Sequence, residues 1–216
     1  MNVKRAALLI VGLSALVLAG CFGPIERPIA DFTWCPYGFD GALDYQFTST
    51  STTIDGHYIV SMRWEFDDGT PSEEIWEALH RYTEEDVYHV TLTVTDTRGI
   101  SGTVTKDVPV RMAVEIYPNW KFTLGSRARV TGIVANRADV HLDSVVVKAK
   151  FYDTNGIRIT DGTITLFDLE PGEKVAYTVE AAEYSASIFH ATVGVDSFVA
   201  DCPNSWYSPV ERVPAE

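Results

Sequence analysis

Basic residues are scarce in this chain. Its 216 residues include 17 lysines and arginines against 30 aspartates and glutamates, which gives a net charge of −13 at pH 7. A nucleic-acid partner requires clustered lysine and arginine side chains that displace counterions from the phosphate backbone. The composition therefore argues against nucleic-acid binding, and it is compatible with solubility, with cation binding or with a basic partner.

Motifs for catalysis and metal binding are also missing. The five histidines show no H-E-x-x-H or other metal-ligand spacing, and the chain has neither a G-x-S-x-G nucleophile elbow nor a phosphate-binding loop. These histidines are His57, His80, His89, His141 and His190. We therefore predict that the protein is not an enzyme and that it needs no cofactor.

The N-terminal apolar run is too short for an ordinary membrane span. Lys4 and Arg5 precede an apolar run at residues 6–18, whereas a membrane helix needs roughly 18 to 20 apolar residues. A short apolar run after positive charge is typical of an export signal. Residues 18–21, LAGC, resemble a prokaryotic lipobox, in which the signal is cut before the cysteine and the thiol receives lipid.

The sequence thus predicts a lipoprotein signal peptide at residues 1–20 and lipidation of Cys21, so that a lipid anchor is the contact with the membrane. The alternative is an ordinary export signal with a chance cysteine. Each buried acyl methylene contributes about 0.8 kcal/mol to anchoring. Cleavage would take the net charge from −13 to −15, because Lys4 and Arg5 are lost and no acidic residue is. In a two-membrane bacterium, Phe22 does not resemble the aspartate that commonly retains lipoproteins in the inner membrane, so we expect the outer membrane or cell surface.

Alternating polarity then predicts an all-β fold. In residues 88–96, Val90, Leu92 and Val94 face one way and the threonines between them face the other, which is the period of a half-buried strand. Residues 145–152 alternate similarly and precede an Asn-Gly hairpin signal. Other strand-like runs lie near residues 44–48, 58–66, 103–110, 113–117, 127–135, 157–168, 174–180 and 187–199. Such regular spacing predicts β-sandwiches, and residues 72–79, the one helical candidate, are interpreted as a strand or irregular excursion.

Several motifs in the first half resemble those of one family. Residues 64–69, WEFDDG, resemble the W-x-F-G-D-G signature of the polycystic-kidney-disease (PKD) repeat, and residues 80–82 and 88–96 resemble its H-x-Y and Y-x-V-T-L-T-V-T-D elements. The resemblance covers residues 28–111. It implies an immunoglobulin-like β-sandwich of the kind used as a spacer, adhesion or interaction unit. Asp67 and Asp86 stand where the family usually has glycine, so we expect altered turn geometry there.

Asp67 and Asp68 have three interpretations. They form a turn, because short carboxylates bond nearby backbone amides and Gly69 can take a positive φ. They contribute to a calcium site, for which Glu65, Glu84, Glu85 or Asp96 would supply further oxygens, since Ca²⁺ needs about six or more. Or they act as an acid/base pair, although adjacent strand residues point to opposite faces. The turn is preferred.

The second half resembles another family of small β-sandwiches. A G-x-V-x-N element at residues 132–136, a strand ending in Tyr152-Asp153 and a later L-x-P-G-E turn at residues 169–173 resemble the FxLYD family. In the naming motif, Ala149 and Phe151 replace the first Phe and the Leu. The resemblance covers residues 113–201 and implies no defined activity. Residues 202–216 are assigned to a C-terminal tail.

Cys35 and Cys202 remain after Cys21 is assigned to lipid, and no C-x-x-C motif suggests metal or redox chemistry. Export permits an intramolecular disulfide, an intermolecular one or free thiols. Two domains placed end to end would separate the cysteines by about 50 Å. A disulfide tolerates only about 4.4–6.8 Å between Cα atoms. Pairing is therefore expected to require the second domain to fold back beside the first.

We expect a non-catalytic, lipid-anchored protein of the cell envelope with two immunoglobulin-like β-sandwiches in tandem. Its predicted role is protein binding, adhesion or structural presentation to an envelope protein. The alternative is a carbohydrate-binding or calcium-dependent module accessory to an enzyme or uptake system, because exposed aromatic side chains stack on sugars when they cluster. The candidate aromatic residues are Trp34, Tyr37, Phe39, Trp76, Trp120, Trp206 and Tyr207.

Overall fold

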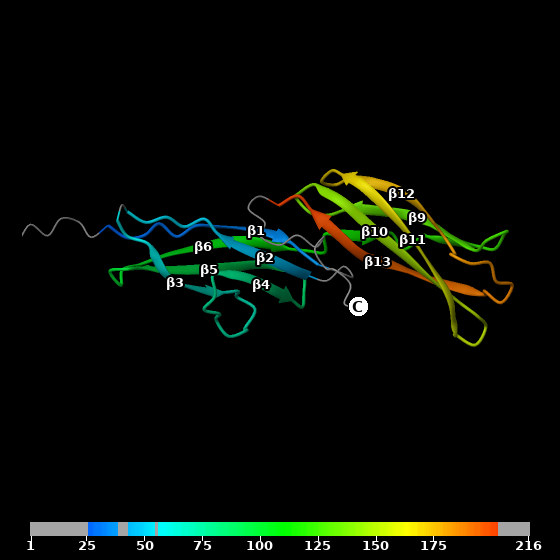
Figure 1. Cartoon of the computed structure of the whole chain (residues 1–216), viewed down its shortest axis with the longest axis horizontal. Helices are drawn as coiled ribbons and strands as arrows, with labels where there is room; N and C mark the ends of the chain where they lie inside the picture. The colour runs from blue at the N-terminus through cyan, green and yellow to red at the C-terminus, as the bar shows by residue number, and fades with distance from the viewer. Residues whose placement is uncertain (1–25, 39–42, 55, 203–216) are drawn as a thin grey trace, which may run out of the picture.

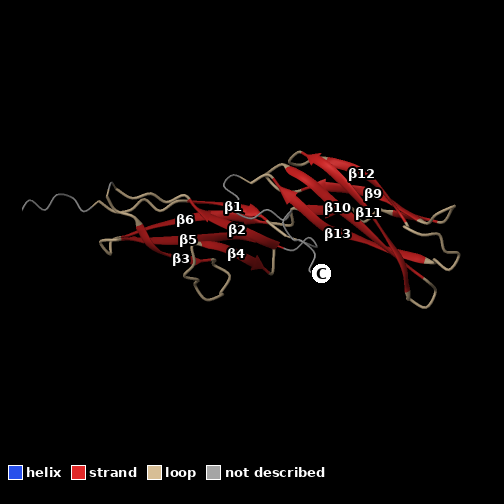
Figure 2. Ribbon diagram, viewed as in Figure 1, coloured by secondary structure: helices blue, strands red, loops and turns tan. Residues whose placement is uncertain are grey.

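The computed structural model describes residues 26–38, 43–54 and 56–202. All regular structure in these residues is β, and the predicted all-β fold with two sandwich units in tandem is confirmed (Figure 2). Within the same ranges no helix is present that is long and apolar enough to span a membrane. The predicted signal peptide, the lipidation residue Cys21 and most of the predicted tail lie outside the described residues.

The first unit packs two antiparallel three-stranded sheets, β1-β2-β4 and β3-β5-β6, against each other (Figure 1). Its strands are β1 (Phe32–Pro36), β2 (Leu43–Ser49), β3 (Ile59–Glu65), β4 (Glu77–Tyr82), β5 (Asp86–Asp96) and β6 (Ser101–Val110). The alternation in β5 is confirmed, because Val90, Leu92 and Val94 are fully buried in the core. The intervening threonines face outward, and the hydroxyls of Thr91 and Thr105 lie 2.8 Å apart across the strands.

Residues 72–79 form no helix. The backbone of Glu73 pairs with that of Trp64 as an isolated bridge, and β4 begins at Glu77. The indole Nε1–H of Trp64 donates to the carbonyl of Ile75 at 3.0 Å. Because Trp64 is completely buried, this bond ties the excursion to the core of the first unit.

The second unit also has two layers. Its sheets are β11-β10-β13 and β12-β9-β7, with β8 pairing with β9. The strands are β7 (Val114–Ile116), β8 (Lys121–Thr123), β9 (Arg129–Asn136), β10 (Leu142–Tyr152), β11 (Arg158–Leu169), β12 (Lys174–Glu180) and β13 (His190–Ala200). Its core is separate from that of the first unit, and it contains Val145, Val147, Ala149 and Phe151 from β10.

Polar turns close the second unit as the sequence indicates. The carboxylate of Asp153 accepts the backbone N–H groups of Asn155 at 2.8 Å and of Ile157 at 2.9 Å. Asn136 is buried, and its side-chain amide donates to the carbonyls of Val140 and Leu169, each at 2.9 Å. These bonds satisfy backbone groups that would otherwise be costly to bury.

The two units lie end to end along the long axis of the molecule (Figure 1). The described chain begins at the far end of the first unit, and β6 leads directly across the junction to β7. The outermost part of the second unit is therefore the part farthest from the N-terminal segment.

Candidate functional site

Asp67 and Asp68 are both engaged in turn hydrogen bonds. Asp67 takes the left-handed conformation with φ 62°, and its Oδ2 accepts the backbone N–H of His89 at 3.0 Å. Asp68 Oδ1 accepts the backbone N–H and the hydroxyl of Thr70, at 3.0 and 2.6 Å. The two carboxylates contact different partners and do not converge on one point, which fits the turn interpretation.

A calcium site at these residues has no support from neighbouring ligands. Within the described part of the chain, no group of three or more His, Cys, Asp or Glu side chains is placed to hold a metal ion. Two of the further candidates have other partners: Glu85 bonds Arg137 and the Met112 amide, and the buried carboxylate of Asp96 pairs with Arg98 at 2.6 Å.

His80 completes a buried polar contact under the Asp68 turn. Its Nε2 lies 2.8 Å from Asp68 Oδ2, and its ring stacks on Phe66 with centroids 3.8 Å apart. Burial raises the pKa of Asp68, but the hydrogen bonds from Thr70 and His80 outweigh it and hold the pKa below its usual value. An ionised carboxylate only accepts, so His80 donates its Nε2–H. Beside it, burial raises the pKa of Tyr82, whose hydroxyl has no partner among the described residues.

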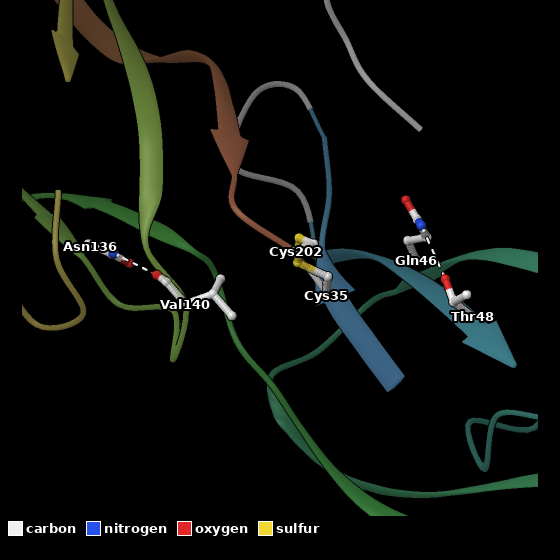
Figure 3. Close-up of a disulfide and its surroundings, with 6 residues drawn as sticks. All are labelled: Cys35, Gln46, Thr48, Asn136, Val140 and Cys202. Carbon is white, nitrogen blue, oxygen red and sulfur yellow. Dashed lines mark hydrogen bonds between the residues drawn. A yellow bond between two sulfur atoms is a disulfide. The ribbon is translucent and has the colours of Figure 1, made fainter. Parts of the chain in front are cut away.

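Cys35 and Cys202 are joined by a disulfide across the junction of the two units, with 5.9 Å between their Cα atoms (Figure 3). The prediction that such pairing requires the second unit to lie beside the first is wrong. β1 runs toward the junction and carries Cys35 near its end, while β13 returns to the same junction two residues before Cys202. The cysteines therefore occupy facing ends of the units, and the 50 Å separation assumed that they occupy opposite ends.

Polar contacts reinforce the junction. Glu85 accepts the backbone N–H of Met112 at 2.8 Å and the guanidinium of Arg137 at 3.1 Å. The first of these bonds is the main reason that the pKa of Glu85 is lowered. Arg111, which follows β6, pairs with Asp139 of the second unit. Charged side chains of both units thus contribute contacts across the junction. The disulfide and these pairs limit the rotation of one unit against the other.

Those predicted aromatic residues that lie in the described ranges do not gather into one surface. Trp34 packs half-buried against the first core and Trp120 against the second. Trp76 is 56% exposed on the excursion before β4, and Tyr37 is half-buried. Three of the predicted residues, Phe39, Trp206 and Tyr207, lie outside the described ranges.

The outward side of sheet β11-β10-β13 carries aromatic and polar groups that the sequence did not indicate as a binding surface. We call this surface the β10 face. Phe167 is 68% exposed on β11, opposite Ser144. At the other end of β10, the ring of Tyr152 stacks on that of His190, with centroids 5.0 Å apart. Alternation in β10 places Lys148 and Lys150 outward. Nothing in the sequence indicates which side chains of β11 and β13 lie beside them.

A hollow of about 390 Å³ lies between these aromatic groups. It is lined by Lys148, Lys150, Thr192, Val193, Gly194, Val195 and Asp196. Lys148 Nζ lies 3.2 Å from Asp196 Oδ1, and Gly194 is the residue directly opposite Lys148 on β13. A Cβ atom added at Gly194 would have no heavy atom within 4 Å, so the missing side chain is what opens the surface there.

A second hollow, of about 500 Å³, lies beside the junction. It contains Arg111, Arg137 and Lys174, together with the acidic residues Glu115 and Asp139. Both arginines pair with carboxylates, and Lys174 lies 5.0 Å from the centre of the Tyr117 ring. These contacts account for its charges as part of the junction.

Comparison with known proteins identifies the first unit. Residues 26–111 match the family model described as PKD domain, and this part of the chain is a PKD domain. A 64-residue segment is 38% identical to a microbial collagenase of Vibrio alginolyticus, and it covers 30% of this chain and 8% of the collagenase. The chain thus spans less than a tenth of that curated relative.

Two solved structures are also similar. The PKD1 domain of the Vibrio cholerae metalloprotease PrtV is 34% identical, with 40% of this chain and 99% of that chain covered and a TM-score of 0.35. A structure that describes the promiscuous specificity of carbohydrate-binding modules from the β-sandwich superfamily is 14% identical. The match covers 81% of this chain and 98% of that chain, with a TM-score of 0.36. The resemblance of residues 113–201 to the FxLYD family stays a prediction.

Proposed function

We propose that this chain is a non-catalytic carbohydrate-binding protein that works outside the cytoplasm as an accessory to a polymer-degrading or uptake system. The second unit carries the binding surface, and the PKD domain serves as its spacer. The observation that carries this proposal is the β10 face, where the exposed ring of Phe167 and the Tyr152–His190 stack lie on one side of a sheet. Ligand sites combine aromatic surface with a few placed polar groups, as this one does.

The compartment follows from the junction. Disulfides persist in oxidising compartments, and the Cys35–Cys202 bond is consistent with a protein outside the cytoplasm. The segment similar to a collagenase supports an accessory role, because that enzyme acts on a polymer and the shared segment is a small part of it. The described chain begins at the end of the PKD domain remote from the second unit (Figure 1). A lipid tether at Cys21, five residues before the first described residue, would therefore hold the β10 face away from the membrane.

The test is binding of the purified mature chain to a panel of polysaccharides, measured by affinity electrophoresis in gels that contain each polymer. We expect retardation by at least one polymer and reduced retardation for Phe167→Ala. The matched control is Tyr58→Ala, which removes a ring with 68% exposure from the PKD domain, away from the β10 face. Failure of every polymer to retard the wild-type chain would refute a carbohydrate-binding function.

The clamped junction favours a second candidate, the structural presentation of a partner-binding unit at the envelope. A disulfide and two sets of ion pairs across a short connection suit a rod that must hold its shape. Crosslinking on intact cells followed by mass spectrometry tests it. Recovery of one protein partner, reproducibly and without polysaccharide binding, would favour this role over the first.

A further inference from the structure

We infer that the β10 face binds an extended, uncharged polysaccharide whose chain lies along β10, with its middle in the hollow at Gly194 and its flanks against Phe167 and the Tyr152–His190 stack. This inference rests on the proposed function, and it adds the site, the direction of the ligand and its chemical class.

The length of the face sets the shape of the ligand. Phe167 lies opposite Ser144 and His190 lies opposite Tyr152, so the aromatic groups are separated by eight residue positions of one continuous strand. At about 3.3 Å per residue that distance is about 26 Å. A single sugar cannot span it, whereas several rings of an extended chain can contact both ends together.

The hollow supplies room and hydrogen-bonding groups in the middle of this path. Gly194 has open space above it, and the neighbouring Thr192 is exposed. Lys148 is a donor and Asp196 an acceptor, held 3.2 Å from each other. A sugar hydroxyl both donates and accepts, so it can bond such a pair without disturbing its charge balance.

The charges around the hollow favour a neutral polymer. Lys148 is paired with Asp196, and Lys150 stands opposite Asp161, which itself pairs with Arg158 at 3.0 Å. The chain as a whole has a net charge of −13, which repels a polyanion at low salt. Hydroxyl groups are not repelled by the negative charge of the chain, and they do not compete with Asp196 or Asp161 for the lysines. With its lysines set against Asp196 and Asp161, the hollow presents little uncompensated positive charge and is suited to a ligand that carries hydroxyls rather than carboxylates.

The inference predicts a dependence on ligand length. Oligomers long enough to reach both aromatic ends should bind more tightly than dimers, and Phe167→Ala should weaken the long oligomers by about tenfold while leaving the shortest unchanged. Sodium chloride at 0.5 M should leave the affinity for a neutral polymer nearly unchanged, because screening acts on charged contacts.

The experiment is isothermal titration calorimetry of the full mature chain with neutral β-1,4-linked oligomers of glucose, xylose, mannose and N-acetylglucosamine, and with alginate as the acidic probe. The key variant is Gly194→Phe, which fills the hollow; Gly194 has no left-handed φ and no neighbour in the way. Thr178→Phe is the matched control, because it places the same ring at an exposed position of β12, outside the β10 face. Equal melting temperatures establish that both variants fold. If Gly194→Phe does not fold, Phe167→Ala gives a second test of the site.

We expect Gly194→Phe to abolish binding and Thr178→Phe to leave it intact. Binding of a neutral polymer that survives both Gly194→Phe and Phe167→Ala would overturn the site while the proposed function stands. Binding of alginate alone, lost in 0.5 M salt, would overturn the neutral class. Absence of binding to every probe would overturn the proposed function together with this inference.

Discussion

Replacement of Asp68 by alanine should lower the free energy of unfolding of the PKD domain, whereas replacement of its neighbour Asp67 by glycine should leave it nearly unchanged. The two carboxylates are adjacent in sequence but do different work. Asp68 accepts three hydrogen bonds, from the amide and hydroxyl of Thr70 and from His80. Asp67 accepts one, from the backbone of His89, and holds a left-handed φ that glycine adopts more easily.

The magnitude follows from burial. The side chains of Asp68 and His80 are 12% and 6% exposed, so removal of the carboxylate leaves the imidazole N–H buried without a partner. That loss costs about 1–3 kcal/mol, and the bonds from the more exposed Thr70 add about 1 kcal/mol. We expect about 2–4 kcal/mol for Asp68→Ala and about 1 kcal/mol for Asp68→Asn, whose amide oxygen can still accept. For Asp67→Gly the lost bond and the relieved backbone strain offset each other to within about 1 kcal/mol.

Acid should expose the same contact. The pKa of Asp68 is lowered in the folded chain, so its stabilisation is fully present above the unfolded pKa and is lost as pH falls through the lower, folded value. In the wild type we therefore expect this contribution to begin to fall below about pH 4 and to be lost as the pH passes the lower, folded pKa. In Asp68→Asn the corresponding part of the acid sensitivity should be absent.

Hydrogen exchange of peptides from β5, read by mass spectrometry, measures the opening free energy of the PKD domain separately from that of the second unit. Peptides from β10 serve as the internal control. An Asp68→Ala variant within about 0.5 kcal/mol of the wild type would refute the structural role of the carboxylate and reopen a functional one. A loss for Asp67→Gly as large as that for Asp68→Ala would show that the two residues act as one unit.

Other parts of the chain give further predictions. Cys35→Ser should lower the free energy of unfolding by up to about 5 kcal/mol in the chain-entropy model, since the bond closes a loop between residues 167 positions apart; a urea titration unchanged from wild type would contradict this. Glu85→Ala should change the small-angle scattering profile little while the disulfide is intact, because the exposed pair with Arg137 contributes only about 0–1 kcal/mol alone. After the disulfide is reduced, the profile of the variant should indicate a wider range of arrangements of the two units than that of the wild type. Equal profiles after reduction would show that Glu85 does not help to hold the two units together. Cys21→Ala should release the protein from the membrane fraction into the medium or periplasm, and retention at wild-type levels would disprove the lipid anchor.

Local features of the fold could be predicted from the sequence because they depend on neighbouring residues. The alternation of Val90, Leu92 and Val94 defines the buried side of β5 wherever that strand lies. Asp68 and Asp153 form turns because their carboxylates reach amides two residues along the chain. The motifs of the PKD domain combine such local signals, and for this reason the resemblance over residues 28–111 could be seen in the sequence, and the family model matches residues 26–111.

Tertiary structure decided the junction and the candidate binding site. Whether Cys35 and Cys202 can meet depends on the directions in which β1 and β13 run relative to the boundary between the units, and strand-length arithmetic alone placed them at the wrong ends. The β10 face depends on register between three strands: only the pairing of β10 with β11 and β13 places Gly194 opposite Lys148 and Phe167 opposite Ser144. Periodicity tells which side of a strand is buried. Register between distant strands is fixed by the packing of the whole sandwich, so the sequence could define the sheet's two sides but not the surface that they present.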